Sequence, residues 1–189
     1  MRGILNLPCE VVGSVLRSFD NVHCLLPALL TCRHFYASFQ ETPGVAATVL
    51  RRQVDPKRLP FSIAILEASN LPHPRSPVLV KALLDKLYHR SDELAAQASI
   101  IPTRDILMLG RVHDVIESLA TDFLSQAWAR LGLVQDDDSL AIAPMEFLSA
   151  CRAFYLAELC IRAFCQDPNR EPDFDDRKLV AARNLPLDE

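Results

Sequence analysis

Apolar residues recur at helical spacing through almost every stretch of this chain. Near the N-terminus the apolar residues fall at i, i+1, i+4, i+5 and i+8, in the order Val11, Val12, Val15, Leu16 and Phe19. This spacing marks one face of a helix and does not fit the strict alternation of a strand. Only five of the 189 residues are Gly, and the tight hairpin turns of an all-β protein commonly need Gly, so an all-β fold is disfavoured. The sequence therefore predicts an all-α fold.

The overall composition indicates a globular protein and excludes several function classes. Half of the residues are hydrophobic and the formal net charge is −4, whereas a general nucleic-acid binder would show a basic excess. No apolar run reaches the roughly 18 to 20 residues that span a bilayer. Glu10 and Arg17 interrupt the N-terminal apolar stretch, which argues against a secretory signal. We expect a protein of the cytoplasm and/or the nucleus, with no membrane and no nucleic-acid partner.

The cysteines are expected to be free thiols. In a reducing compartment a disulfide framework would not persist, so the six are predicted to be buried and reduced. They are Cys9, Cys24, Cys32, Cys151, Cys160 and Cys165.

The first 54 residues are expected to hold three short helices and a fourth after a turn. Pro8 suits the first helical turn, because its missing N–H has no partner to lose there. Asn21 is expected to cap the second helix, which would run to about Leu30. Thr31 is expected to cap the third. Pro27 would break the second helix unless that helix starts near Leu25.

The rest of the chain divides into a connector and a longer helical region. Five prolines interrupt residues 55–77, at Pro56, Pro60, Pro72, Pro74 and Pro77, and this stretch is predicted to be a connector with one short helical piece. Residues 78–184 are predicted to form an irregular helical domain. Its helices are expected at 78–88, from a Ser91 cap onward, at 103–130 with a break near Gly110, from Pro144 onward, and at 176–184.

Four short motifs follow one another in the N-terminal region. They are Leu7-Pro8-Cys9-Glu10, the aliphatic positions named above, the apolar run from Leu25 to Leu30, and Cys32-Arg33-His34-Phe35. In this order, over residues 4 to about 54, the chain resembles an F-box of the filamentous-fungal type. The later stretch "CRAFYLAELCIRAF", with "DVIESLATDFLSQAW" before it, is similar to the helical region that follows such F-boxes.

The resemblance implies a substrate-receptor subunit of an SCF-type cullin–RING ubiquitin ligase. Residues 1–54 would bind the Skp-family linker subunit, and through it the cullin, while residues 78–184 would hold an unidentified protein substrate. The chain would act by raising effective concentration rather than by chemistry. The partner-binding residues implied are Leu7, Pro8, Val11, Val12, Val15, Leu16, Phe19, Leu29, Cys32 and Phe35.

A size argument supports a partner for the N-terminal helices. Three helices in about 45 residues have too much apolar surface to hide against one another. The alternative is a helical interaction or structural protein whose N-terminal helices belong to its own core. An open apolar patch at Leu7, Pro8, Val12, Leu16 and Phe35 would favour a missing partner, whereas cover from residues 78–184 would weaken the ligase interpretation.

Searches for catalytic and metal-binding patterns favour neither an enzyme nor a metal protein. The sequence contains no P-loop, no paired-Gly dinucleotide loop and no Gly-x-Ser-x-Gly, so no catalytic residue and no cofactor is predicted. The spacing of Cys24, Cys32 and His34 does not match a zinc site. The run Asp136–Asp138 lacks the Gly and distal Glu of an EF-hand loop.

Two groups of charged or titratable residues are expected on helix surfaces. His113, Asp114 and Glu117 share one helix, where a solvated face is favoured over an acid–base pair because no nucleophile is near. Three further charges gather on about a third of the last long helix, at Arg152, Glu158 and Arg162.

Overall fold

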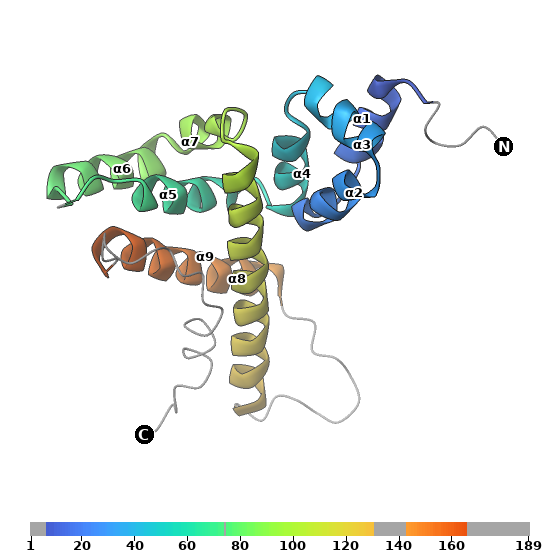
Figure 1. Ribbon diagram of the computed structural model, residues 1–189. Helices are drawn as coiled ribbons and strands as arrows, with labels where there is room; N and C mark the ends of the chain where they lie inside the picture. The colour runs from blue at the N-terminus through green and yellow to red at the C-terminus, as the bar shows by residue number, and fades with distance from the viewer. Residues whose placement is uncertain (1–6, 74, 131–142, 166–189) are drawn as a thin grey trace.

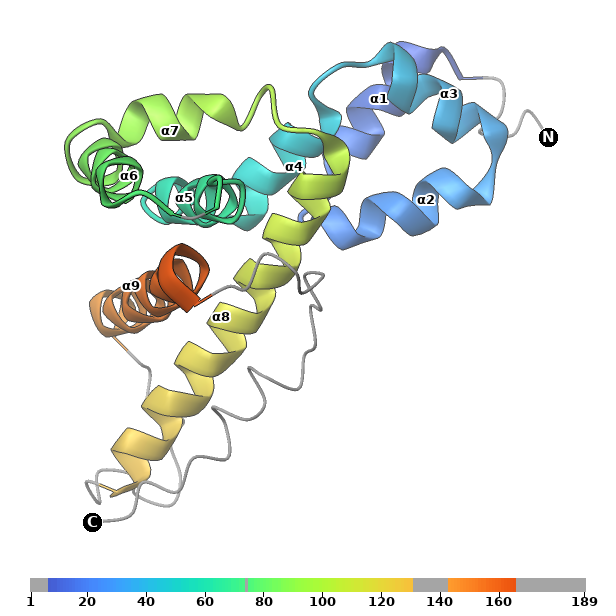
Figure 2. The same ribbon diagram turned by 60° about the vertical axis from the view of Figure 1, so that its left-hand side comes forward.

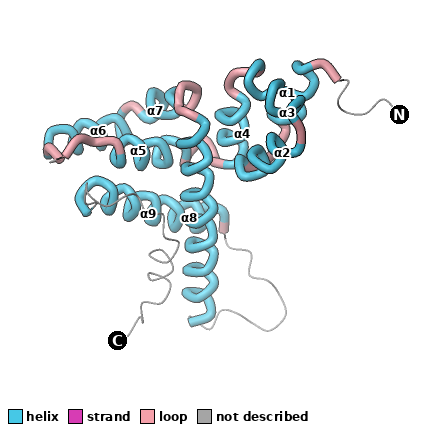
Figure 3. Tube along the Cα trace, in the orientation of Figure 1, coloured by secondary structure: helices cyan, strands magenta, loops and turns pink. Residues whose placement is uncertain are grey.

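The computed structural model describes residues 7–73, 75–130 and 143–165, and every regular element within these residues is a helix (Figure 1; Figure 3). The predicted all-α fold is confirmed. The predicted helix at 176–184 and the run Asp136–Asp138 lie outside the described residues.

The helices fall into a short-helix region and a long-helix region. The first contains α1 (Cys9–Arg17), the 3₁₀ turn η2 (Val22–Cys24), α2 (Leu25–Thr31), α3 (Arg33–Glu41) and α4 (Val45–Gln53). The second contains α5 (Leu59–Ser69), α6 (Pro77–His89), α7 (Ser91–Gln97), α8 (Thr103–Arg130), α9 (Pro144–Cys160) and the π-helical turn η3 (Ile161–Cys165).

Capping residues explain where the N-terminal helices begin. Pro8 lies at the N-cap of α1, one residue before the helix, and its carbonyl oxygen accepts from the backbone N–H of Val11 at 3.0 Å. Asn21 caps η2 as predicted, because its Oδ1 accepts from the backbone N–H of His23 at 2.7 Å. A side-chain acceptor at this position satisfies one of the backbone donors that a helix start leaves unpaired.

The start of α2 makes Pro27 harmless, whereas the predicted Thr31 cap is wrong. The helix begins at Leu25, so Pro27 lies in its first turn, where its missing N–H has no intrahelical partner. Cys32 occupies the N-cap position of α3, and the Thr31 hydroxyl donates to the carbonyl of Ala28 at 2.6 Å. The predicted Ser91 cap is also displaced, since α7 begins at Ser91 itself.

The segment predicted as a connector contains the most buried helix of the described chain. In α5, Ile63, Ala64 and Ile65 are at most 1% exposed. A helix that is apolar all round is expected to be buried, and α5 packs against α6, α7, α8 and α9. One continuous hydrophobic core runs from Val12 in α1 to Leu159 in α9. The division at 54/55 and 77/78 stays a prediction.

The predicted break near Gly110 is wrong, because α8 is continuous over 28 residues. Gly110 serves close packing instead: a Cβ built on it would overlap Cγ2 of Val22 in η2. The N-terminal half of α8 contacts α4 and η2, and α9 crosses it further along (Figure 1; Figure 2). The C-terminal half of α8 extends past α9 in both views.

Two expectations about side-chain exposure need correction. Among the described thiols only Cys151 is buried, while Cys24 and Cys160 are exposed, although all of these remain free. On α9, Arg152 is exposed as expected, but Glu158 is buried and its Oε1 accepts from Nε of Arg162 at 2.6 Å. Their pairing explains how the carboxylate can face the core.

Candidate partner-binding surface

Helix α1 is apolar on two adjacent faces, about 100° apart around the helix. Val12 and Leu16, on the inner face, are 1% and 0% exposed. Val11 and Val15 are 44% and 40% exposed on the outer face, and Leu7, two residues before the helix begins, is 38% exposed. We call these three residues the outer stripe. An ordinary surface helix carries polar residues on its solvent face, so the outer stripe is the unusual feature of α1.

The inner face of α1 is covered from within the first 53 residues. Its main contacts are with α3 and α4. Gly13 allows one close approach, since a Cβ at this position would overlap Oγ1 of Thr42. Burial of this face by residues 78–184 would have weakened the ligase interpretation. Those residues do not supply the main contacts of α1.

Hydrogen bonds tie both ends of α1 to the chain around α3. At the start, Nε2 of His34 donates to the carbonyl of Leu7 at 2.9 Å. At the end, Nη2 of Arg17 donates to the carbonyl of Pro43 at 3.1 Å. These contacts hold α1 in one orientation and so keep the outer stripe facing solvent.

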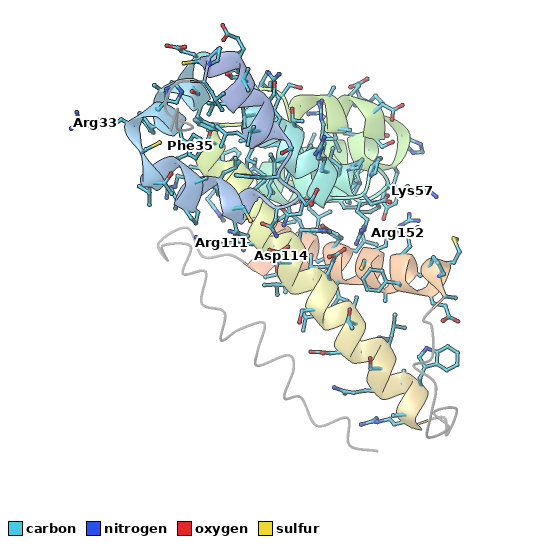
Figure 4. All side chains as sticks on the ribbon, turned by 90° about the vertical axis from the view of Figure 1, so that its right-hand side faces the viewer. Arg33, Phe35, Lys57, Arg111, Asp114 and Arg152 are labelled. Carbon is cyan, nitrogen blue, oxygen red and sulfur yellow. The ribbon has the colours of Figure 1, made fainter. Side chains whose placement is uncertain are left out.

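The ten predicted partner-binding residues do not share one environment. The exposed ones are Leu7, Pro8, Val11 and Val15; the buried ones are Val12 and Leu16; the partly buried ones are Phe19, Leu29, Cys32 and Phe35. Phe19, Leu29 and Phe35 pack against the hydrophobic core. Figure 4 shows Phe35 among the N-terminal helices, whereas Arg33 points away from them. Of the ten, the four exposed residues are the most accessible to a partner.

Three exposed apolar residues in the same region were not among the predicted partner-binding residues. Leu26, Leu30 and Tyr36 are 46%, 77% and 55% exposed. Leu26 and Leu30 are four residues apart and therefore lie on one face of α2, which is the signal that would have found them. α1, α2 and α3 thus each present apolar side chains to solvent.

A polar junction joins these helices to α8. Oδ1 of Asp114 accepts from Nε2 of Gln53 at 2.6 Å, and its Oδ2 accepts from Nδ2 of Asn21 at 3.3 Å. Oε1 of Gln53 accepts in turn from the backbone N–H of Val22 at 3.1 Å. Figure 4 shows Asp114 on α8 beside the N-terminal helices. The junction orients the N-terminal helices on the rest of the protein.

A second polar cluster lies deeper, between α5, α8 and α9. His113 is 0% exposed, so the predicted solvated face is wrong for this residue. Its Nδ1 is hydrogen bonded to the hydroxyl of Tyr155 at 2.7 Å, and its Nε2 lies 3.3 Å from Oε1 of Glu117. Nη1 of Arg58 donates to the same Glu117 oxygen at 2.6 Å. Burial lowers the pKa of His113, which favours a neutral ring.

The cysteine and tyrosine of this cluster are held in their neutral forms. Burial raises the pKa of the Cys151 thiol, even though Nη1 of Arg58 lies 3.6 Å from its sulfur. Burial also raises the pKa of Tyr155. A raised pKa keeps both groups protonated near neutral pH. The cluster therefore contributes to holding α5, α8 and α9 together.

Two further searches cover the described residues alone. Within residues 7–73, 75–130 and 143–165, no group of three or more His, Cys, Asp or Glu side chains is placed to hold a metal ion. In the same residues, no helix combines the length and apolarity that crossing a bilayer requires.

Comparisons with known proteins do not indicate a function for this chain. No protein-family model matches the chain, no curated protein matches it, and no solved structure matches its fold.

Proposed function

We propose that the chain is a substrate-receptor subunit of an SCF-type cullin–RING ubiquitin ligase, acting in the cytoplasm and/or the nucleus. Its N-terminal helices, within residues 1–54, would bind the Skp-family linker subunit and through it the cullin. The observation that carries this proposal is the outer stripe, Leu7, Val11 and Val15, exposed beside a face of α1 that is already packed.

The outer stripe supplies a reason to bind a second chain. Each of its three side chains keeps about two fifths of its surface in water. Covering that remainder would contribute about 1 kcal/mol for each side chain, before the cost of association is counted. Leu26, Leu30 and Tyr36 extend the apolar area available to the linker subunit.

The second region would hold the substrate, and no catalytic residue is assigned to the chain. A receptor needs only to keep a substrate lysine near the ubiquitin-charged enzyme, which is an effect of local concentration. A rigid link between the linker-binding helices and the substrate-binding region serves this task. The bonds from Gln53 and Asn21 to Asp114 provide such a link.

The test is binding of the purified chain to a purified Skp-family linker subunit. The double variant Val11→Asp, Val15→Asp places two charges in the proposed interface without touching the inner face of α1. We expect its affinity to fall by about 100-fold or more, because an unpaired charge buried in an interface costs about 3 kcal/mol. The matched control is Val78→Asp on α6, where the side chain is 73% exposed and far along the chain.

The outcomes separate the proposal from its alternative. Linker binding that survives the double variant contradicts the surface proposed. A folded, unmodified chain that never binds the linker supports the second candidate, a helical interaction or structural protein outside any ligase. That candidate is favoured by one observation: the continuous core joins Val12 in α1 to Leu159 in α9, so the N-terminal helices share the core of the whole chain.

A further inference from the structure

A hydroxyl residue followed by proline occurs twice in the chain, as Thr42-Pro43 and as Ser76-Pro77. Proline-directed protein kinases transfer a phosphoryl group to a serine or threonine that proline follows, and they bind the substrate segment in an extended conformation. Both the exposure of the hydroxyl and the cost of extending the residues after it therefore decide whether such a site can be used.

The chain around Ser76 is open to an enzyme. Ser76 is the N-cap residue of α6 and has an extended backbone, with φ −74° and ψ 129°. Its Oγ accepts from the backbone N–H of Val78 at 3.3 Å, in an exposed hydrogen bond. Pro77 is exposed, Val78 and Leu79 are 73% and 39% exposed, and the first buried residue of α6 is Val80. Opening the first turn of α6 thus uncovers no core residue and costs little free energy.

Thr42 has the opposite surroundings. It links α3 to α4, and its Oγ1 packs against α1, where a Cβ on Gly13 would overlap it. The helix that follows begins with core residues, since Val45 is 1% and Ala46 is 4% exposed. Extending the chain after Thr42 would pull these residues out of the core, which costs far more than opening the first turn of α6.

Positive charge beside Ser76 favours a phosphate there. Arg75 precedes it, and its Nε and Nη1 are buried with no hydrogen-bond partner in the part of the chain that the structure describes. Burial first, and then the charge of Arg162 in η3, lowers the pKa of Arg75. A phosphate on Ser76 would bring a dianion within reach of these unpaired donors and of the positive end of the α6 dipole.

We propose that Ser76 is a phosphorylation site for a proline-directed protein kinase and that Thr42 is not. The kinase transfers the γ-phosphoryl group of ATP to Oγ of Ser76. A P–O bond to this oxygen forms, the P–O bond to the departing ADP breaks, and the hydroxyl proton passes to the base of the kinase. The proposal is independent of linker binding, because α6 lies at the other end of the molecule from α1, α2 and α3 (Figure 1; Figure 2).

The test is incubation of the full chain with a purified mitogen-activated protein kinase, ATP and Mg²⁺, with the modified residue located by mass spectrometry. We expect phosphate on Ser76, none on Thr42, and no reaction of Ser76→Ala. Pro77→Ala should slow the reaction by about 10-fold or more, because it removes the residue that this class of kinase selects. The matched control is Pro43→Ala, which removes the proline after Thr42 and should leave the rate unchanged.

Hydrogen exchange measures what the phosphate does to α6. The backbone N–H groups of Val78 and Leu79 should exchange about 2- to 5-fold more slowly in the phosphorylated chain, because negative charge at a helix N-terminus stabilises the first turn. Arg75→Gln should reduce this protection without preventing phosphorylation. Unchanged exchange at both N–H groups would contradict the placement of the phosphate at the start of α6.

Three results of the kinase reaction would overturn the proposal. In the first, Ser76 of the folded chain stays unmodified. A synthetic peptide of residues 70–82 then shows the reason, because a modified peptide means that the fold blocks the site and an unmodified one means that the sequence is not recognised. In the second, Thr42 is modified at least as fast as Ser76. In the third, Pro77→Ala is modified as fast as the unaltered sequence.

Discussion

Val11 and Val12 are neighbours in the chain, yet Val12 is 1% exposed in the core and Val11 is 44% exposed to solvent. Consecutive residues on a helix point about 100° apart, so two adjacent valines can serve two different surfaces. Here one stabilises the fold, and the other belongs to the proposed linker-binding surface.

The two faces of α1 predict opposite responses to the same substitution. Leu16→Asp should lower the free energy of unfolding by about 3 kcal/mol or more, because it buries an unpaired charge among α1, α3 and α4. Val11→Asp should change it by no more than about 0.5 kcal/mol, since the side chain is exposed. Urea denaturation of both variants measures the difference. Equal destabilisation by the two substitutions would contradict the assignment of inner and outer faces.

Gly110 predicts a reversal of the usual effect of glycine in a helix. Replacing an interior helical Gly by Ala ordinarily stabilises by about 1 kcal/mol. At Gly110 the added Cβ would overlap Val22 of η2, so Gly110→Ala should destabilise by about 1 to 3 kcal/mol.

A double-mutant cycle tests this contact directly. Val22→Ala removes the methyl groups that the new Cβ would meet. The double variant Gly110→Ala, Val22→Ala should therefore be at least about 1 kcal/mol more stable than the sum of the single effects. Strictly additive changes in the free energy of unfolding would show that the side chains at positions 22 and 110 do not clash.

The positions of most helices along the chain could be predicted from the sequence. Which face of each helix packs against the core was harder to predict. The apolar period of α1 gave its position along the chain, but aliphatic residues on both faces leave a single sequence unable to say which face is packed. That choice depends on where α3 and α4 lie, which is tertiary information. The same limit explains why Leu16 was assigned to a partner although the chain itself covers it.

His113 shows how local composition can mislead. Asp114 and Glu117 share its helix and no nucleophile is near, which favoured a solvated face. Yet His113 follows Leu109 by four residues and precedes Ile116 by three, so it lies on the buried stripe of α8. The spacing to these two aliphatic residues was the better guide.

The middle of the chain shows a related limit of composition. Its five prolines suggested a connector, but Pro60 lies in the first turn of α5, where proline is tolerated. The apolar run that follows has no polar face, as expected of a helix covered on all sides. Composition alone could not say that this helix would form the centre of the described core.

The junction at Asp114 predicts a measurable contribution to stability. Asp114→Ala removes the acceptor for Gln53 and Asn21 and should lower the free energy of unfolding by about 1 kcal/mol, a modest loss because the Asp114 side chain is 41% exposed. Asp114→Asn keeps an acceptor oxygen and should lose about half as much. Chemical denaturation measures both variants, and indistinguishable stabilities for the unmodified chain and Asp114→Ala would argue against a stabilising junction.

The buried ring of His113 predicts that the protein loses stability as pH falls. Its pKa is lowered in the folded state, first by burial, so the unfolded chain binds a proton more readily. The charged and titratable groups around it are Glu117 and Asp114 on α8, Arg58 before α5, and Tyr155 and Cys151 on α9. Of these, Glu117 and Asp114 act to raise the pKa of His113, and Arg58 acts to lower it.

The loss should begin as pH falls through about 6.5, the pKa of an unfolded histidine, and continue down to the lower pKa of the folded state. Each unit of lowering corresponds to about 1.4 kcal/mol. Denaturation at pH 7.5 and pH 5.5 should therefore show a smaller difference for His113→Gln than for the unmodified chain. The matched control is His89→Gln, because the His89 side chain is 75% exposed and should leave the pH dependence unchanged. An unaltered pH dependence in His113→Gln would mean that the buried ring is not the group that titrates.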